Sequence, residues 1–156
     1  MRRRPRTLLI VDLQQAAAVP PRVVAGIRRY AQGFDCRVFT RFVNPRDSLF
    51  RRQLDQHCCH PGSADTRLLI EPGPDDLVLA KPGYGLPAAA VRKIRRLRAR
   101  EIVVCGIDTD ACVLGVMFSL VDAGIPCRAK AAHCWSSSGL HGPAVRILRQ
   151  QFEVLE

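Results

Sequence analysis

Short apolar runs alternate with amphipathic stretches along the whole chain. The runs 8–11 and 102–105 are apolar at every position, a pattern typical of strands that are buried on both faces of a parallel sheet. A third run of this kind covers 77–79. The segments that we expect to form strands are 8–11, 36–42, 77–79, 102–105, 126–131 and 154–155.

Helical periodicity fills most of the intervals between these strands. Pro20 and Pro21 open the first predicted helix, because proline is favoured in the first helical turn. Thr109 or Asp110 is expected to cap the predicted helix that ends near Gly124. Helices are predicted at 21–30, 86–98, 109–124 and 139–152, whereas 43–75 reads as a long irregular region.

This alternation of strand and helix predicts an α/β fold with right-handed crossovers. We expect three layers, α/β/α, around a mainly parallel, Rossmann-like sheet of about six strands. The chain has 156 residues, no internal repeat and no Ser/Gly linker, so a single domain over 1–156 is expected, with 1–6 as an Arg-rich N-terminal arm.

Composition removes several classes of protein. Hydrophobic residues make up 47% and charged residues 24%, which excludes a disordered tail and a polytopic membrane protein. The 11 uncharged positions between Asp110 and Asp122 fall short of the ~20 that a spanning helix needs. Asp12 interrupts the N-terminal apolar run before it reaches the length of a signal-peptide core. Seven cysteines, an odd number without the spacing of a disulfide scaffold, favour the cytoplasm, where thiols stay reduced.

The net charge is +10, and only three of the 24 basic residues are lysines. The basic residues gather at 2–6 and along 92–100, where they form the outer face of a predicted amphipathic helix. We interpret them as a solvated basic surface. A nucleic-acid partner is the weaker alternative, and it would show as salt-sensitive binding to duplex DNA or heparin.

Polar residues follow three of the predicted buried strands. Asp12 ends the first, Lys81 follows the third, and the turn 106–112 follows the fourth. Ligands of parallel α/β sheets bind at the carboxyl ends of the strands, so these groups are expected to converge. Cys112 would lie in the first turn of a helix, where backbone amides and a nearby ammonium favour thiolate over thiol. Asp12 could hold the lysine and carry a proton.

The same residues carry a family resemblance. The ordered motifs VDLQ (11–14), VFTRF (38–42), VLAKPGYG (78–85) and GIDTDACVLGV (106–116) resemble those of the isochorismatase-like cysteine hydrolases. That family includes nicotinamidases, N-carbamoylsarcosine amidases and other small-amide hydrolases. The similarity spans about residues 7–153, and GIDTDACV is its most specific part.

The resemblance implies a catalytic triad of Asp12, Lys81 and Cys112. It also implies a cis peptide bond at Ile107–Asp108 and an oxyanion hole made of the backbone amides of Asp108 and Cys112. The implied reaction begins with sulfur attack on a carbonyl carbon. An amine or ammonia then leaves with a proton from Asp12, and water hydrolyses the thioester. No cofactor is expected.

Several positions depart from the family pattern. Nicotinamidases carry a metal-binding Asp-x-His motif after the second strand, whereas this chain has Arg41 to Pro45, so no metal is expected there. Gly85 and Pro87 stand about where the lysine loop usually has Ser and Phe, and His133 replaces an aspartate after the fifth strand. These changes predict a pocket of altered shape.

Four residues are candidates for contact with the substrate. Gln14 closes the first-strand motif, Arg41 could clamp a carboxylate by a bidentate contact, and Tyr84 and Trp135 could line the site. For Arg41, Tyr84 and Trp135, surface or core packing is the competing interpretation. The HCCH run at 57–60 could suggest a metal clip, but adjacent cysteines suit tetrahedral coordination poorly.

The sequence therefore predicts a metal-independent cysteine hydrolase that cleaves a C–N bond of a small molecule. Isochorismatase-type vinyl-ether hydrolysis is the alternative within the family, although the intact Cys112 argues against it. A non-catalytic binding or assembly relative is the alternative outside enzymes. A homo-oligomer is expected, since relatives commonly form dimers or larger assemblies, and no membrane partner is expected.

Overall fold

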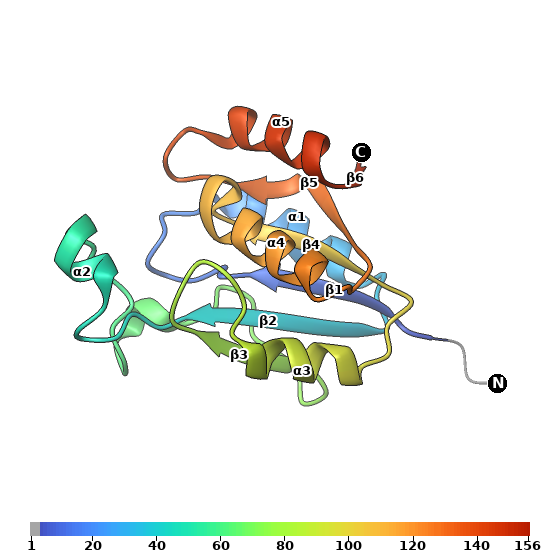
Figure 1. The fold of residues 1–156 in the computed structure, drawn as a ribbon, viewed down its shortest axis with the longest axis horizontal. Coiled ribbons are helices and arrows are strands. Elements are labelled where there is room, and N and C mark those ends of the chain that lie inside the picture. The colour runs from blue at the N-terminus through green and yellow to red at the C-terminus, as the bar shows by residue number, and fades with distance from the viewer. Residues whose placement is uncertain (1–3) are drawn as a thin grey trace.

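In the computed structural model, which describes residues 4–156, a parallel sheet of six strands forms the centre (Figure 1). The strand order is β3-β2-β1-β4-β5-β6, and every neighbouring pair is parallel. The strands are β1 (Arg6–Val11), β2 (Cys36–Phe42), β3 (Leu77–Lys81), β4 (Glu101–Ile107), β5 (Cys127–Trp135) and β6 (Val154–Leu155). The predicted fold class is confirmed.

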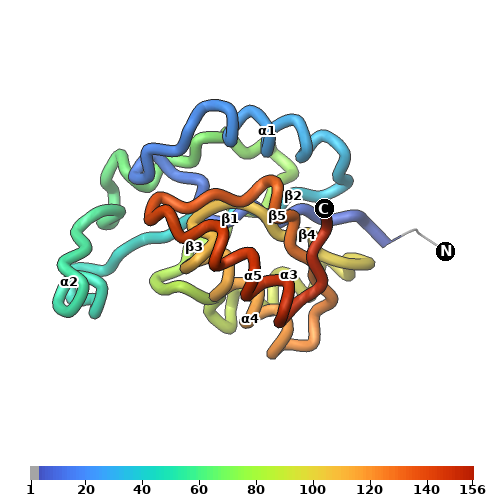
Figure 2. Tube along the Cα trace, turned by 90° about the horizontal axis from the view of Figure 1, so that it is seen from above, coloured from blue at the N-terminus to red at the C-terminus, as the bar shows by residue number. Residues whose placement is uncertain are grey.

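Helices cover both faces of this sheet. One face carries α1 (Pro21–Ala31), and the other carries α3 (Ala88–Arg96), α4 (Leu114–Asp122) and α5 (His141–Gln151) (Figure 2). A short helix, α2 (Leu49–Leu54), projects beyond the end of the sheet at which the strands terminate (Figure 1). No helix in the described part of the chain is long and apolar enough to cross a membrane.

The apolar residues of β1 and a glycine in β4 explain why these two strands lie at the centre of the sheet. Leu8, Leu9, Ile10 and Val11 of β1 are fully buried, as expected for a strand with helices on both sides. Gly106 of β4 has φ +119°, and a Cβ there would lie 2.3 Å from the Val11 carbonyl oxygen. Only glycine allows β4 to lie this close to the end of β1.

Two local predictions need correction. The fifth strand runs on to Trp135 rather than ending near 131, and its register with β4 shifts between Val104 and Gly106. The region 43–75 contains α2 and a 3-10 turn, Ala64–Thr66, besides irregular backbone. Part of it pairs with the segment after β1, through a bridge between Gln14 and Leu68.

The N-terminal arm is also shorter than predicted. Residues 1–3 lie outside the described residues, and Arg6 is already the first residue of β1. The Arg6 guanidinium donates to the carbonyl of Gly33 and lies 5.0 Å from the centre of the Phe34 ring. Arg6 is therefore part of the folded domain.

Candidate active site

The sheet topology brings the ends of β1, β3 and β4 to one edge. Asp12 follows β1 directly and has φ 44°, a left-handed conformation that turns its side chain out of the strand alternation. Lys81 is the last residue of β3. Cys112 lies in a π-helical turn, Thr109–Val113, which joins β4 to α4.

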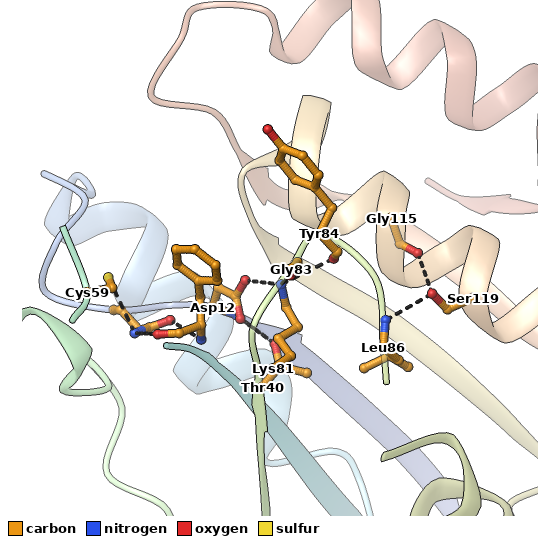
Figure 3. Close-up of polar contacts among 11 residues, drawn as sticks. Asp12, Thr40, Cys59, Lys81, Gly83, Tyr84, Leu86, Gly115 and Ser119 are labelled. Atoms are coloured by element: carbon orange, nitrogen blue, oxygen red, sulfur yellow. Dashed lines mark hydrogen bonds and ion pairs between the residues drawn. The ribbon is translucent and has the colours of Figure 1, made fainter. Parts of the chain in front are cut away.

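Asp12 and Lys81 form a buried ion pair (Figure 3). Lys81 Nζ lies 2.7 Å from Asp12 Oδ2, and the two side chains are 0% and 7% exposed. The other carboxylate oxygen, Oδ1, accepts a hydrogen bond from the Thr40 hydroxyl at 2.6 Å. The Asp12 amide in turn donates to Thr40 Oγ1. Both carboxylate oxygens are thus held in fixed directions.

The loop after β3 completes the coordination of the ammonium. Lys81 Nζ donates to the carbonyls of Gly83 and Tyr84, at 2.6 and 3.2 Å (Figure 3). This loop is held against α4, because the Ser119 hydroxyl accepts from the Leu86 amide and donates to the Gly115 carbonyl. With two carbonyls and one carboxylate as acceptors, all three donors of the ammonium are used.

Cys112 lies within electrostatic reach of this ion pair. The charges of both Asp12 and Lys81 act on the Cys112 thiol. Burial, and then the negative charge of Asp12, raise the pKa of the thiol to about 12, against the opposing effect of the Lys81 ammonium. The expectation that the site would favour a resting thiolate is therefore wrong, because burial outweighs the helix terminus and the lysine.

The turn that carries Cys112 has an unusual backbone. The Ile107–Asp108 peptide bond is cis, as the resemblance implied. The carbonyl of Asp108 accepts from the amides of both Ala111 and Val113, and the Cys112 amide lies between these two donors. The predicted caps Thr109 and Asp110 are wrong, since the residue before the turn is Asp108 and its side chain makes no cap hydrogen bond.

A cavity of about 320 Å³ opens in front of these residues. Its lining includes Asp12, Cys112 and Asp108, and the small residues Ala16, Ala17 and Ala18. Facing aromatic side chains, Phe42, Phe50 and Tyr84, stack edge to face at centroid distances of 5.1 and 4.9 Å. The remaining lining residues are Gln14, Gln56, Cys58, Cys59, Ile107, Ala111 and Ser137.

The candidate substrate-binding residues differ in where they lie. Tyr84 and Gln14 line the cavity, but the Gln14 amide is already engaged with both backbone groups of Phe42. Arg41 and Trp135 do not line it. Arg41 is inside β2, between Thr40 and Phe42, and strand alternation turns it to the opposite face of the sheet. Trp135 closes β5 and packs against the core.

The residues do not fit the metal site of a nicotinamidase. After β2 the chain presents Asn44, whose buried amide nitrogen donates to the carbonyls of Gln56 and Cys58. Asparagine binds a metal through Oδ1, and this oxygen of Asn44 already accepts a hydrogen bond from the Ser48 hydroxyl. Among residues 4–156, no group of three or more His, Cys, Asp or Glu side chains lies together in a way that could hold a metal ion.

The HCCH run at 57–60 likewise does not converge. The His57 ring contacts Asp55, and the His60 ring contacts Arg51. The Cys59 sulfur accepts from the Gln14 amide and lies 3.8 Å from the Asp65 carbonyl oxygen. Cys58 faces the cavity of the candidate active site instead.

Sequence reasoning missed several residues of the cavity. Phe50 and Cys58 come from the region 43–75, which has no periodicity that points to a site. Thr40 looked like an ordinary strand residue, although its place opposite Asp12 across β1 and β2 makes it the partner of that carboxylate. Ser137 follows β5 and binds the Asp108 side chain. Of these residues, only Ser137 could have been suspected from the sequence, because it follows a predicted strand.

The comparison with known families decides the classification. A family model described as isochorismatase domain matches residues 7–155, nearly the whole chain. The chain belongs to the isochorismatase family of hydrolases. No curated protein matches its sequence.

Solved structures share the fold of this isochorismatase domain. An isochorismatase-like hydrolase from Alkaliphilus metalliredigens superimposes with a TM-score of 0.83 at 12% identity, covering 96% of this chain and 93% of the other. The pyrazinamidase of Pyrococcus horikoshii, solved in complex with zinc, gives 0.82 at 15% identity, covering 97% and 98%. The nicotinamidase PncA of Bacillus subtilis gives 0.79 at 16% identity, covering 97% and 99%.

Proposed function

We propose that this isochorismatase-family hydrolase cleaves a C–N bond of a small amide through a thioester on Cys112, without a metal. The observation that carries the proposal is that Cys112 and the buried Asp12–Lys81 ion pair meet at one cavity, which Cys112 and Asp12 both line. Nicotinamidase and pyrazinamidase among the proteins of the same fold support an amide as substrate.

The first half of the reaction would form the thioester. The carboxylate of Asp12 takes the S–H proton as the sulfur attacks the amide carbon, and the carbonyl electron pair moves onto oxygen. We expect the backbone amides of Asp108 and Cys112 to donate to that oxyanion. Collapse of the tetrahedral intermediate breaks the C–N bond, and the nitrogen leaves with the proton from Asp12.

The second half would release the acid. Asp12 takes a proton from water, the hydroxide attacks the thioester carbon, and the C–S bond breaks. The sulfur then recovers the proton from Asp12, so that the thiol and the carboxylate return to their starting forms. Because Lys81 stays paired with Asp12, its ammonium keeps the carboxylate oriented at the start of each half-reaction.

The raised pKa of Cys112 is compatible with this sequence of steps. A thiol that stays protonated in the resting site loses its proton only when a carbonyl carbon is present to accept the sulfur electron pair. The base that would remove the proton, Asp12, lines the same cavity as the thiol and acts on it by charge. The seven free cysteines of the structure fit a reducing compartment, and we infer a cytoplasmic location.

Vinyl-ether hydrolysis remains the alternative reaction of the same site. That reaction needs an acid such as Asp12 but no nucleophile. Only amide hydrolysis would therefore depend on the Cys112 thiol. The test is a panel of small primary amides assayed for ammonia release with the wild-type protein and with Cys112→Ala. Loss of hydrolysis in Cys112→Ala, together with a trapped acyl-enzyme in the wild type by mass spectrometry, supports the proposal. Activity that survives Cys112→Ala contradicts it.

A further inference from the structure

The charge of the cavity is unusual for a site that must stabilise an oxyanion. None of its lining residues is Arg, Lys or His. The nearest ammonium, on Lys81, is already paired with Asp12. A second carboxylate, that of Asp108, belongs to the lining and has no ion-pair partner among residues 4–156.

The Asp108 carboxylate is held in place by the loop after β5. The Ser137 amide donates to Oδ1 at 2.8 Å, and the Ser137 hydroxyl donates to Oδ2 at 3.1 Å. Each carboxylate oxygen can accept two hydrogen bonds, so one acceptor site remains on each. Asp108 and Ser137 both line the cavity, so a ligand bound there would lie next to this carboxylate.

This carboxylate carries an electrostatic cost. Burial raises the pKa of Asp108, the two hydrogen bonds from Ser137 oppose this rise only in part, and the charges of Asp110 and Asp12 add to it. Its charge would also oppose the oxyanion that forms next to the Asp108 amide in the proposed reaction. A positive group on the substrate would remove both effects, since it would pair with the carboxylate and reduce the local negative charge.

We propose that Asp108 determines specificity, and that the cavity selects small amides that carry a positively charged nitrogen group, such as an aminoalkyl or amidinium group. This inference rests on the proposed function for the reaction at Cys112. The preference for a cationic group depends only on the charge of the cavity and not on the reaction at Cys112. The aromatic side chains of Phe42, Phe50 and Tyr84 would contact the carbon skeleton of the substrate, and their ring faces would attract its cationic group.

The first test measures the charge that a reagent meets at Cys112 and needs no substrate. Cys112 is modified with 2-aminoethyl and 2-sulfonatoethyl methanethiosulfonate, and the two rates are read from the Cys112 peptide by mass spectrometry. The ratio of the cationic to the anionic rate cancels changes in the thiol itself, which affect both reagents. We expect the cationic reagent to react faster and the ratio to fall roughly tenfold in Asp108→Asn.

A matched control is the neighbouring carboxylate of Asp110. Asp110 binds the Ser138 hydroxyl and does not line the cavity, so Asp110→Asn should keep most of the preference. A ratio near or below one in the wild type overturns the proposal. So does a ratio that Asp108→Asn leaves unchanged, or one that Asp110→Asn lowers equally.

The second test compares substrates of equal size. Pentanamide and 4-aminobutanamide differ in one terminal group, and their ratio of kcat/KM should favour the amine in the wild type and move toward the neutral amide in Asp108→Asn. A structural defect would lower both values together. Preference of the wild type for pentanamide contradicts the proposal. If neither amide is hydrolysed while the reagent ratio still depends on Asp108, the proposed amidase function fails and the cation selectivity stands.

Discussion

At the residue scale, the buried ion pair is the most constrained feature of the site. Lys81 has no route to solvent, and its three acceptors are the Asp12 carboxylate and two carbonyls. Removing one member of such a pair leaves the other charged and buried, which typically costs about 3–5 kcal/mol. The pair therefore affects folding as well as chemistry.

We expect Lys81→Met to lower the free energy of unfolding by about 3–5 kcal/mol, because Asp12 would remain without a cation. Urea denaturation measures the change. The double variant Asp12→Asn/Lys81→Met should recover part of the loss, since it removes both charges. Lys93→Met is the control, because Lys93 is exposed on α3. Equal stability of the Lys81 and Lys93 variants would show that the pair contributes nothing.

The titration of Cys112 gives a second prediction. With a pKa of about 12, the thiol is almost fully protonated at neutral pH, and its iodoacetamide labelling rate should rise tenfold per pH unit without a plateau below pH 10. The Asp12 charge raises this pKa, so Asp12→Asn should lower it and label faster at any fixed pH while losing hydrolysis. The other cysteines in the same digest serve as the reference. A plateau below pH 8.5 would rule out the buried, protonated thiol.

At the scale of elements, the site depends on how the loop after β3 packs on α4. A Cβ on Gly115 would lie 2.7 Å from the carbonyl carbon of Tyr84 and 2.8 Å from its oxygen, an acceptor of Lys81. The absence of a side chain at Gly115 thus lets the loop reach the helix and present its carbonyls to the ammonium (Figure 3). The packing of two elements thus sets the position of Lys81, one member of the proposed catalytic site.

Gly115→Ala should therefore move the loop and disturb Lys81. We expect a loss of about 1–3 kcal/mol of stability, as for other overpacked sites, and a larger loss of hydrolysis. Gly142→Ala is the matched control, because a Cβ on Gly142 of α5 meets nothing within 4 Å and alanine is the better helix former. Denaturation and ammonia release are measured for both. Unchanged activity in Gly115→Ala would mean that the close approach is not required.

The elements also show how far sequence could lead. The continuous apolar runs predicted β1, β3 and β4, and the convergence of Asp12, Lys81 and Cys112 follows from parallel strands ending at one edge. Arg41 lies inside the predicted strand 36–42, but the sequence does not tell which of the two faces of that strand lies next to the site. The raised pKa of Cys112 could not be predicted either. The burial of its thiol depends on side chains from α2 and from the loop after β5, which are distant in sequence.

At the scale of the whole molecule, one face leaves apolar side chains in solvent. The helix α4 is apolar around most of its circumference, and although Val116, Met117 and Leu120 are buried, Phe118 and Val121 are 43% and 49% exposed. Ile147 on α5, on the same side of the sheet, is 43% exposed (Figure 2). A helix of this composition is usually covered on both sides, which supports the expected homo-oligomer.

We expect copies of the chain to associate through this face, and the net charge sets the sign of the salt effect. Each copy carries +10, so two copies repel one another, and added salt should screen the repulsion and favour assembly. Binding to nucleic acid would respond in the opposite direction, since salt weakens phosphate contacts. Light scattering at 50 and 500 mM NaCl would measure the mass. Phe118→Lys should yield the monomer, whereas Leu54→Lys, on the distant α2, should not. A monomeric wild type at both salt concentrations would refute association through α4.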